Sequence, residues 1–107
     1  MMLEAHEIYR YLRTNLLIQW TWGFNNPKTI AFGLEFDVKG LAFSGTIRIR
    51  KNREDGLCVL YFINEQGRQI RKIWDVKLKN LIPLLDANID GVEGEKWQAI
   101  KKTYLFK

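Results

Sequence analysis

Histidine and cysteine are nearly missing from this chain of 107 residues, which contains one of each. A catalytic triad or a zinc site built from several histidines and cysteines needs more of these side chains than the chain supplies. His6 falls within a predicted helix, where we expect it on the surface. Cys58 lies in an apolar run, where a buried thiol is the expected state. We therefore predict no metal site, no cofactor and no catalytic residues.

Glycine-rich phosphate loops and long apolar runs are also missing. The glycines are dispersed and match neither the Walker nor the dinucleotide-binding pattern. No stretch approaches the about 18 apolar residues of a membrane helix, and charged residues interrupt the start of the chain. A short chain destined for an oxidising compartment usually carries several cysteines. We therefore expect a protein of the reducing cytoplasm, without a membrane partner.

Without a second histidine, acid-base chemistry would have to rest on carboxylates. Glu35 and Asp37 fall on one face of a predicted strand, and Asp86 and Asp90 are spaced as neighbours on a helix. Both patterns are typical of solvated faces, and neither is joined by a third acidic group at the spacing of a metal site. We predict that the protein is not an enzyme.

The chain does contain enough apolar residues for a folded core. Hydrophobic residues make up 47% of it, including four Trp, six Phe and four Tyr. A chain of this length has room for one domain, which we predict over residues 1–107. The 17 Lys and Arg against 12 Asp and Glu give a net charge of +5, which favours anionic partners.

The clearest pattern is a β-hairpin over residues 29–50, in which apolar and polar residues alternate on both sides of Lys39-Gly40. A two-residue turn there would place the apolar residues of the two strands opposite one another. The expected pairs are Val38 with Leu41, Phe36 with Phe43, Leu34 with Gly45 and Phe32 with Ile47. The other side of the hairpin would carry Glu35, Asp37, Ser44, Thr46, Arg48 and Arg50.

Helical spacing predicts a helix over residues 3–14, whereas period-two alternation predicts a strand over residues 16–24. Residues 25–27, Asn-Asn-Pro, are typical of a turn. The aromatic residues of the predicted strand, Trp20, Trp22 and Phe24, would share one face. They would pack in the core or, as the alternative, form an exposed platform on which bases stack.

Two further strands are expected over residues 57–64 and 68–74, and the uneven spacing of Ile70 and Ile73 would fit a bulge. A helix over residues 80–89 would begin after Asn80 as N-cap, with Pro83 tolerated in the first turn. Residues 97–104 have the spacing of a short third helix. Together the elements predict an α+β fold: an antiparallel sheet of four or five strands, an N-terminal helix and one or two C-terminal helices.

Seven basic residues are predicted to converge across the sheet as a phosphate-binding face. If Ile47 pairs with Val59, the outward neighbours of these cations are apolar, so that bases can stack beside them. Those neighbours are Cys58, Leu60 and Phe62. Alternatively, a helix covers them and the cations are only a solvated edge. The basic residues are Arg48, Arg50, Lys51, Arg53, Arg68, Arg71 and Lys72.

Three short motifs carry a family resemblance: Gly33-Leu34-Glu35-Phe36, Gly40-Leu41-Ala42-Phe43, and Leu84-Leu85-Asp86 through Ile89-Asp90. With these motifs, residues 33–90 resemble small proteins encoded by bacterial phages and conjugative elements, in which a Gly-Leu-x-Phe strand precedes a hairpin and an acidic helix end. The resemblance covers about half of the chain and implies a mobile-element origin. It brings no assigned active residues.

The order of elements, antiparallel strands followed by a helix, also resembles the fold of the positive-cofactor-four and Whirly families, which implies binding of single-stranded DNA. The chain departs from that order by an added N-terminal helix and an added C-terminal segment. The basic cluster from Arg48 to Arg53 motivates the leading hypothesis, a binding module that contacts nucleic acid through the basic face. The alternative is a module for protein-protein interaction or homo-oligomerisation, in which exposed apolar residues meet another polypeptide.

Overall fold

Apolar residues at helical spacing form α1 (Leu3–Leu12), inside the predicted range. The computed structural model describes residues 3–14 and 20–91. Ala5, Ile8 and Leu12 of α1 are buried, whereas His6 is exposed as predicted. The amphipathic spacing therefore turns one side of this helix toward the core. The third helix predicted at residues 97–104 lies outside the described residues.

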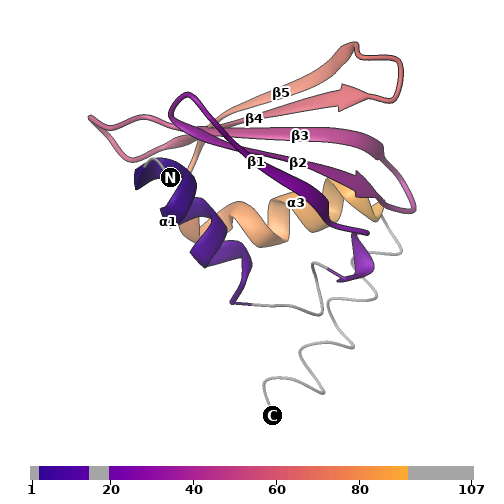
Figure 1. Cartoon of the computed structure of the whole chain (residues 1–107), viewed down its shortest axis with the longest axis horizontal. Helices are drawn as coiled ribbons and strands as arrows, with labels where there is room; N and C mark the ends of the chain where they lie inside the picture. The colour runs from indigo at the N-terminus through magenta and orange to yellow at the C-terminus, as the bar shows by residue number, and fades with distance from the viewer. Residues whose placement is uncertain (1–2, 15–19, 92–107) are drawn as a thin grey trace.

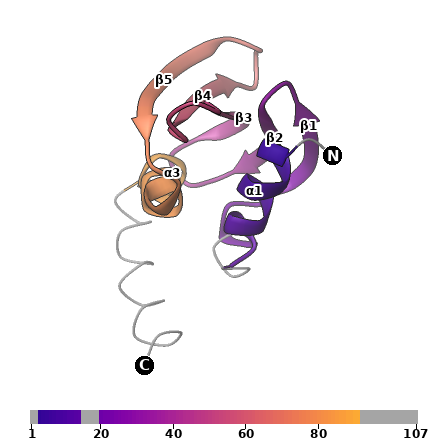
Figure 2. The same ribbon diagram turned by 90° about the vertical axis from the view of Figure 1, so that its left-hand side faces the viewer.

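Most of the remaining described residues form a five-stranded antiparallel sheet and a second helix (Figures 1 and 2). Both helices lie against the same face of the sheet, which confirms the predicted α+β class. Each strand pairs with the next one along the chain. The elements are β1 (Asn25–Ile30), β2 (Gly33–Lys39), β3 (Ser44–Lys51), β4 (Cys58–Asn64), β5 (Gln69–Val76), the short 3-10 helix η1 (Leu78–Asn80) and α3 (Leu81–Ile89).

The core fills the space between the sheet and the helices. Every second residue of β2, β3 and β4 points into it, as the alternation of the sequence predicts. Its buried members include Ile8 and Leu12 of α1, Leu34, Phe36 and Val38 of β2, Ile47 and Ile49 of β3, Cys58, Leu60 and Phe62 of β4, and Leu81, Leu85 and Ile89 of α3.

The helix α3 begins where the sequence predicts, directly after Asn80. Pro83 is in its first turn, where its missing N–H removes no helical hydrogen bond. Leu78 lies in η1, outside α3, and the hydroxyl of Tyr11 donates to the carbonyl of Lys79 in η1 at 2.6 Å. That bond ties the two helical segments together. Beyond α3, Gly91 has a φ of +63°, a conformation that glycine adopts without strain.

The predicted hairpin exists, but its register and its turn are different. Residues 40–43 form the loop, and Leu34 pairs with Ile49 instead of Gly45. The loop docks on the end of α3, where the backbone amides of Ala42 and Phe43 both donate to the carbonyl of Ile89, at 2.8 and 3.0 Å. These bonds satisfy a carbonyl that the helix end leaves open. We attribute the position of the loop to its contact with α3. The two-residue turn predicted at Lys39-Gly40 from the turn residues alone was wrong.

The first run of that hairpin is also interrupted, because residues 31–32 form a turn between β1 and β2. Phe32, predicted to face Ile47, is instead exposed in this turn with a φ of +59°. The predicted turn at residues 25–27 is likewise wrong, since these residues begin β1. Asn26 has a φ of +52° and the register shifts beside it, so the expected irregularity is a bulge within an edge strand. An edge strand also tolerates Pro27.

The strand predicted over residues 16–24 is contradicted where the structure describes it. Residues 20–21 are helical and residues 22–23 form a turn. Trp20 is 78% exposed, Trp22 is fully buried and Phe24 is half-buried, so the three rings do not share a face. The Trp22 indole donates to the carboxylate of Asp86 in α3 at 2.8 Å. The alternating pattern of residues 20–24 therefore belongs to a turn in which only the Trp22 ring is buried, and not to a strand.

The predicted bulge in the last strand is confirmed. The partners Leu60–Ile73 and Cys58–Val76 are two residues apart on β4 and three apart on β5, where Asp75 has a φ of +56°. A second shift leaves Ile70 as an extra residue of β5. Both bulges lie on an edge strand, where they interrupt the row of backbone groups that another strand would pair with.

Candidate nucleic-acid interface

The face of the sheet that points away from α1 and α3 is called the outer face, and no described helix covers it (Figures 1 and 2). On β3 it carries Arg48 and Arg50, as predicted. Their partners in register on β4 are Tyr61 and Val59. Cys58, Leu60 and Phe62 belong instead to the buried face. The predicted apolar neighbours of the arginines were therefore wrong, and the covered-core alternative holds for them.

Four side chains on the outer face alternate between cation and ring, and we call them the cation-aromatic ladder: Arg50, Tyr61, Lys72 and Trp74. The Arg50 guanidinium carbon lies 5.4 Å from the centre of the Tyr61 ring. The Lys72 ammonium lies 5.1 Å from the Tyr61 ring and 4.9 Å from the Trp74 ring. These distances are within the range of cation–π attraction. The ladder crosses β3, β4 and β5, and Trp74 at its end is 60% exposed.

The remaining predicted cations do not join this ladder. Lys51 is paired with the inward-facing Cys58 and therefore lies on the helix side, where it forms an ion pair with Glu7 of α1. Arg53 forms an ion pair with Glu4 of α1 and stacks over the Phe32 ring at 5.0 Å. These two basic residues hold α1 to the end of the sheet.

Arg71 pairs in register with the buried Phe62, so it also lies on the helix side, where its guanidinium donates to Asn88 of α3. Arg68 is exposed in the loop between β4 and β5. Arg48 remains on the outer face and donates to Glu35 of β2 at 2.6 Å. Of the seven predicted cations, the structure thus brings Arg48, Arg50 and Lys72 together on one face.

We expect the Glu4–Arg53 pair to stabilise the fold at neutral pH but not in acid. The hydrogen bond donated by Arg53, followed by one donated by the backbone N–H of Glu4, lowers the pKa of the Glu4 carboxyl from its ordinary value of 4.5, although burial opposes this change. Because the folded-state pKa is the lower one, the stabilisation is present above pH 4.5 and is lost as the pH falls through the folded value. Glu4→Gln should lower the urea midpoint at pH 7 and have no effect below both pKa values.

The matched control for this prediction is Glu54→Gln, which changes an exposed residue of the neighbouring loop. Its urea midpoint should match that of the wild type at both pH values. An equal loss of stability by Glu4→Gln at neutral and acid pH would assign the effect to packing instead of charge.

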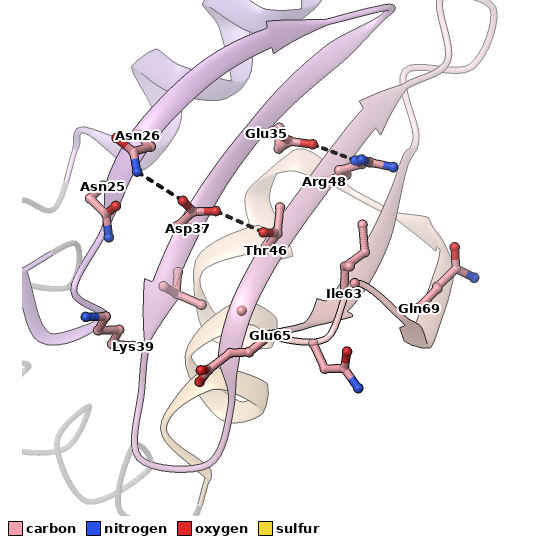
Figure 3. Close-up of a pocket in the computed structure, with 14 residues that line it drawn as sticks. Asn25, Asn26, Glu35, Asp37, Lys39, Thr46, Arg48, Ile63, Glu65 and Gln69 are labelled. Atoms are coloured by element: carbon pink, nitrogen blue, oxygen red, sulfur yellow. Dashed lines mark hydrogen bonds and ion pairs between the residues drawn. The ribbon is translucent and has the colours of Figure 1, made fainter.

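The outer face is hollowed beside Arg48, over β1, β2, β3 and the start of the loop after β4 (Figure 3). This space, called the polar hollow, has a volume of about 740 Å³. Asp37 lines it and accepts hydrogen bonds from Asn26 at 3.1 Å and from Thr46 at 2.9 Å. Its lining includes Asn25, Asn26, Glu35, Asp37, Lys39, Thr46, Arg48, Asn64, Glu65 and Gln69.

The second pair of carboxylates, Asp86 and Asp90, is buried, in contrast to the solvated face that their spacing suggests. Asp86 accepts the indole N–H of Trp22, and Asp90 accepts the backbone N–H of Leu41 at 3.2 Å. Both carboxylates therefore bind loops to α3. Cys58 is buried as predicted, and its burial raises the pKa of the thiol to about 11, far from that of a nucleophile at neutral pH.

Over residues 3–14 and 20–91, no three His, Cys, Asp or Glu side chains are grouped so that they could hold a metal ion. The helices of this part of the chain are too short or too polar to cross a membrane. The chain matches no protein-family model, no curated protein and no solved structure.

Two members of the ladder, Tyr61 and Trp74, were missed by the analysis of the sequence. The signal for Tyr61 was present, because Val59, Tyr61 and Ile63 alternate with the apolar residues that became the core. Which of the two sets faces outward depends on the register between β3 and β4, which local residues do not determine. Trp74 adjoins the bulge of β5, where alternation no longer predicts the face.

Proposed function

We propose that this protein binds single-stranded nucleic acid with the cation-aromatic ladder and that it acts as a binding module without catalysis. The observation that supports the proposal is the alternation of cations and rings over three adjacent strands on a face that no described helix covers. Cations attract phosphates, and rings accept the faces of bases. The ladder therefore offers both contacts that a single strand needs.

A single strand fits this face better than a duplex. In a duplex the faces of the bases are stacked on one another, so Tyr61 and Trp74 would have no surface to stack on. From β3 to β5 the ladder spans two strand spacings, roughly 10 Å. This width suits a short stretch of unstacked nucleotides. The net charge of +5 adds a general attraction for polyanions.

We expect the double variant Arg50→Ala/Lys72→Ala to bind a fluorescent single-stranded oligonucleotide more weakly and with less dependence on salt. Each phosphate contact on a single strand contributes about 0.7 to the slope of log affinity against log salt, so the loss of two contacts should lower the slope by about 1.4. Fluorescence-anisotropy titrations at several salt concentrations from roughly 50 to 200 mM measure this slope. An unchanged slope in a folded double variant would contradict the proposal.

Matched controls distinguish the contribution of the ladder to binding from the effect of removing any charge or any aromatic ring. Arg10→Ala, at an exposed position of α1, removes one charge on the helix side and should change the slope little. Trp74→Ala should weaken binding by about ten-fold, since base stacking contributes roughly 1–3 kcal/mol. Trp20→Ala removes a ring that is even more exposed but lies outside the ladder, so affinity should stay near that of the wild type.

Self-association is the alternative, and one observation favours it. The edge strand β5 exposes two apolar side chains, Ile70 at 58% and Trp74. Exposed apolar residues of this kind are typical of contacts between proteins. Light scattering over a wide range of concentration distinguishes the two functions, because a constant monomer mass would argue against self-association.

A further inference from the structure

We infer that the polar hollow receives one base of the bound strand and prefers guanine, an inference that rests on the proposed function. The hollow adjoins the ladder through Arg48, which lines the hollow and is paired in register with Tyr61. Thr46, in the hollow, and Arg50, in the ladder, lie on the same strand. At about 3.3 Å per residue they are roughly 13 Å apart. A strand that stacks on the ladder can therefore extend into the hollow.

The charges of the hollow admit a base and not a phosphate. Three carboxylates, those of Glu35, Asp37 and Glu65, line the hollow against two cations, Lys39 and Arg48. Arg48 is already paired with Glu35 (Figure 3). A phosphate placed here would meet negative charge, so the backbone of the strand should stay over Arg50 and Lys72. A neutral base meets no such repulsion. The volume of about 740 Å³ is within the usual range for small-ligand sites, about 300–1,000 Å³.

Asp37 is held in a geometry that favours a particular donor pattern. Its Oδ2 accepts a hydrogen bond from Asn26 Nδ2, and its Oδ1 accepts one from Thr46 Oγ1 (Figure 3). The two donors, one on each oxygen, fix the plane of the carboxylate. An ionised carboxylate has about four acceptor positions, so each oxygen retains one. One remaining acceptor position on each oxygen of Asp37 matches a ligand that carries two adjacent N–H donors.

Guanine is the base with that donor pattern. Its Watson–Crick edge presents the N1–H and the N2 amino group side by side. Adenine and cytosine present one amino group next to an acceptor, and thymine presents one imino group between two carbonyls. A bidentate contact between a side chain and a base discriminates by roughly 1–3 kcal/mol, which corresponds to about five-fold or more in affinity. The hollow should therefore bind guanine in preference to the other bases.

The test is a comparison of nine-nucleotide oligothymidylates that differ only in the central base. Replacing the central thymine by guanine should raise the affinity of the wild type about ten-fold. Inosine, which lacks the N2 amino group but stacks like guanine, should lose most of this gain. In Asp37→Asn one acceptor becomes a donor, so the ratio of guanine to thymine affinities should fall to near one. The ratio is insensitive to the change in net charge, which affects both oligonucleotides equally.

Two more variants secure the interpretation. Thr46→Val removes one of the donors that fix Asp37 and should reduce the ratio, and it decides the matter if Asp37→Asn does not fold. Glu54→Gln makes the same chemical change in a loop outside the hollow and should keep the full ratio. A wild-type ratio near one, with binding that still depends on Arg50 and Lys72, would overturn the guanine inference and leave the proposed function standing. No binding of any oligonucleotide would overturn both.

Discussion

Trp22→Ala should lower the free energy of unfolding by about 3–5 kcal/mol, the usual cost of deleting a large buried aromatic ring. Trp22 has no exposed surface, its indole donates to Asp86 at 2.8 Å, and its carbonyl accepts the amide of Lys39 at 2.7 Å. Small domains have a total stability of about 5–15 kcal/mol, so this loss is a large share. Urea denaturation followed by circular dichroism measures it.

A conservative variant separates the ring from its hydrogen bond. Trp22→Phe retains most of the packing but leaves the buried Asp86 without the indole donor, for an expected loss of about 1–3 kcal/mol. Trp20→Ala is the matched control, since this ring is 78% exposed and should contribute little to stability. If Trp22→Ala were as stable as the control, the placement of this ring in the core would be wrong.

Gly33→Ala should lower the free energy of unfolding by about 3 kcal/mol, nearly as much as Trp22→Ala, because it forces β2 and β3 apart. A Cβ at Gly33 would lie 1.8 Å from the carbonyl oxygen of Ile49 in β3. That contact is with backbone, which cannot move aside without loss of the hydrogen bonds between β2 and β3. The expected result is a much lower thermal midpoint, or failure to fold at room temperature.

Gly67→Ala provides the comparison, because a Cβ there would have no atom within 4 Å. Its φ of +82° still makes alanine unfavourable, so a cost of about 1 kcal/mol is expected. Equal midpoints for the two variants would indicate that β2 and β3 approach less closely than described.

Local patterns predicted the elements of the sheet better than the contacts between them. The hairpin register is shifted by four residues, from Gly45 to Ile49 opposite Leu34, and an even shift leaves the side chains that remain paired between β2 and β3 on their predicted faces. Glu35 and Arg48 are therefore on the outer face as expected. The cause of the shift, docking of the loop on Ile89, joins parts of the chain that no local pattern connects.

The register between β3 and β4 is shifted by an odd number of residues, which moves the side chains of β4 to the face opposite the predicted one. Ile47 pairs with Phe62 instead of Val59, three residues away, which exchanges the two faces of β4. The apolar set that was expected beside the arginines became core, and Tyr61 took its place. Because β4 is apolar on both sides, its sequence alone does not select the face.

The seven basic residues were predicted to converge on one face, and the structure brings only three of them together there. Lys51 and Arg53 follow Arg50 closely in sequence, yet both pair with glutamates of α1 near the start of the chain, more than 40 residues away. Opposite charges that are distant in sequence meet only when the helix has docked. The hypothesis of a basic face is therefore reduced to Arg48, Arg50 and Lys72, with the rings that the sequence analysis did not place beside them.

The consecutive order of the strands also bears on how fast the protein reaches its structure. Every strand pairs with its neighbour in the chain, and the connections at residues 31–32, 40–43, 52–57 and 65–68 are short. Short connections close with little loss of chain entropy, and contacts that are local in sequence are associated with rapid folding. The sheet can grow hairpin by hairpin, without the slow search that a crossover connection demands. The ladder, whose members lie on three consecutive strands, would be complete once β3, β4 and β5 have paired.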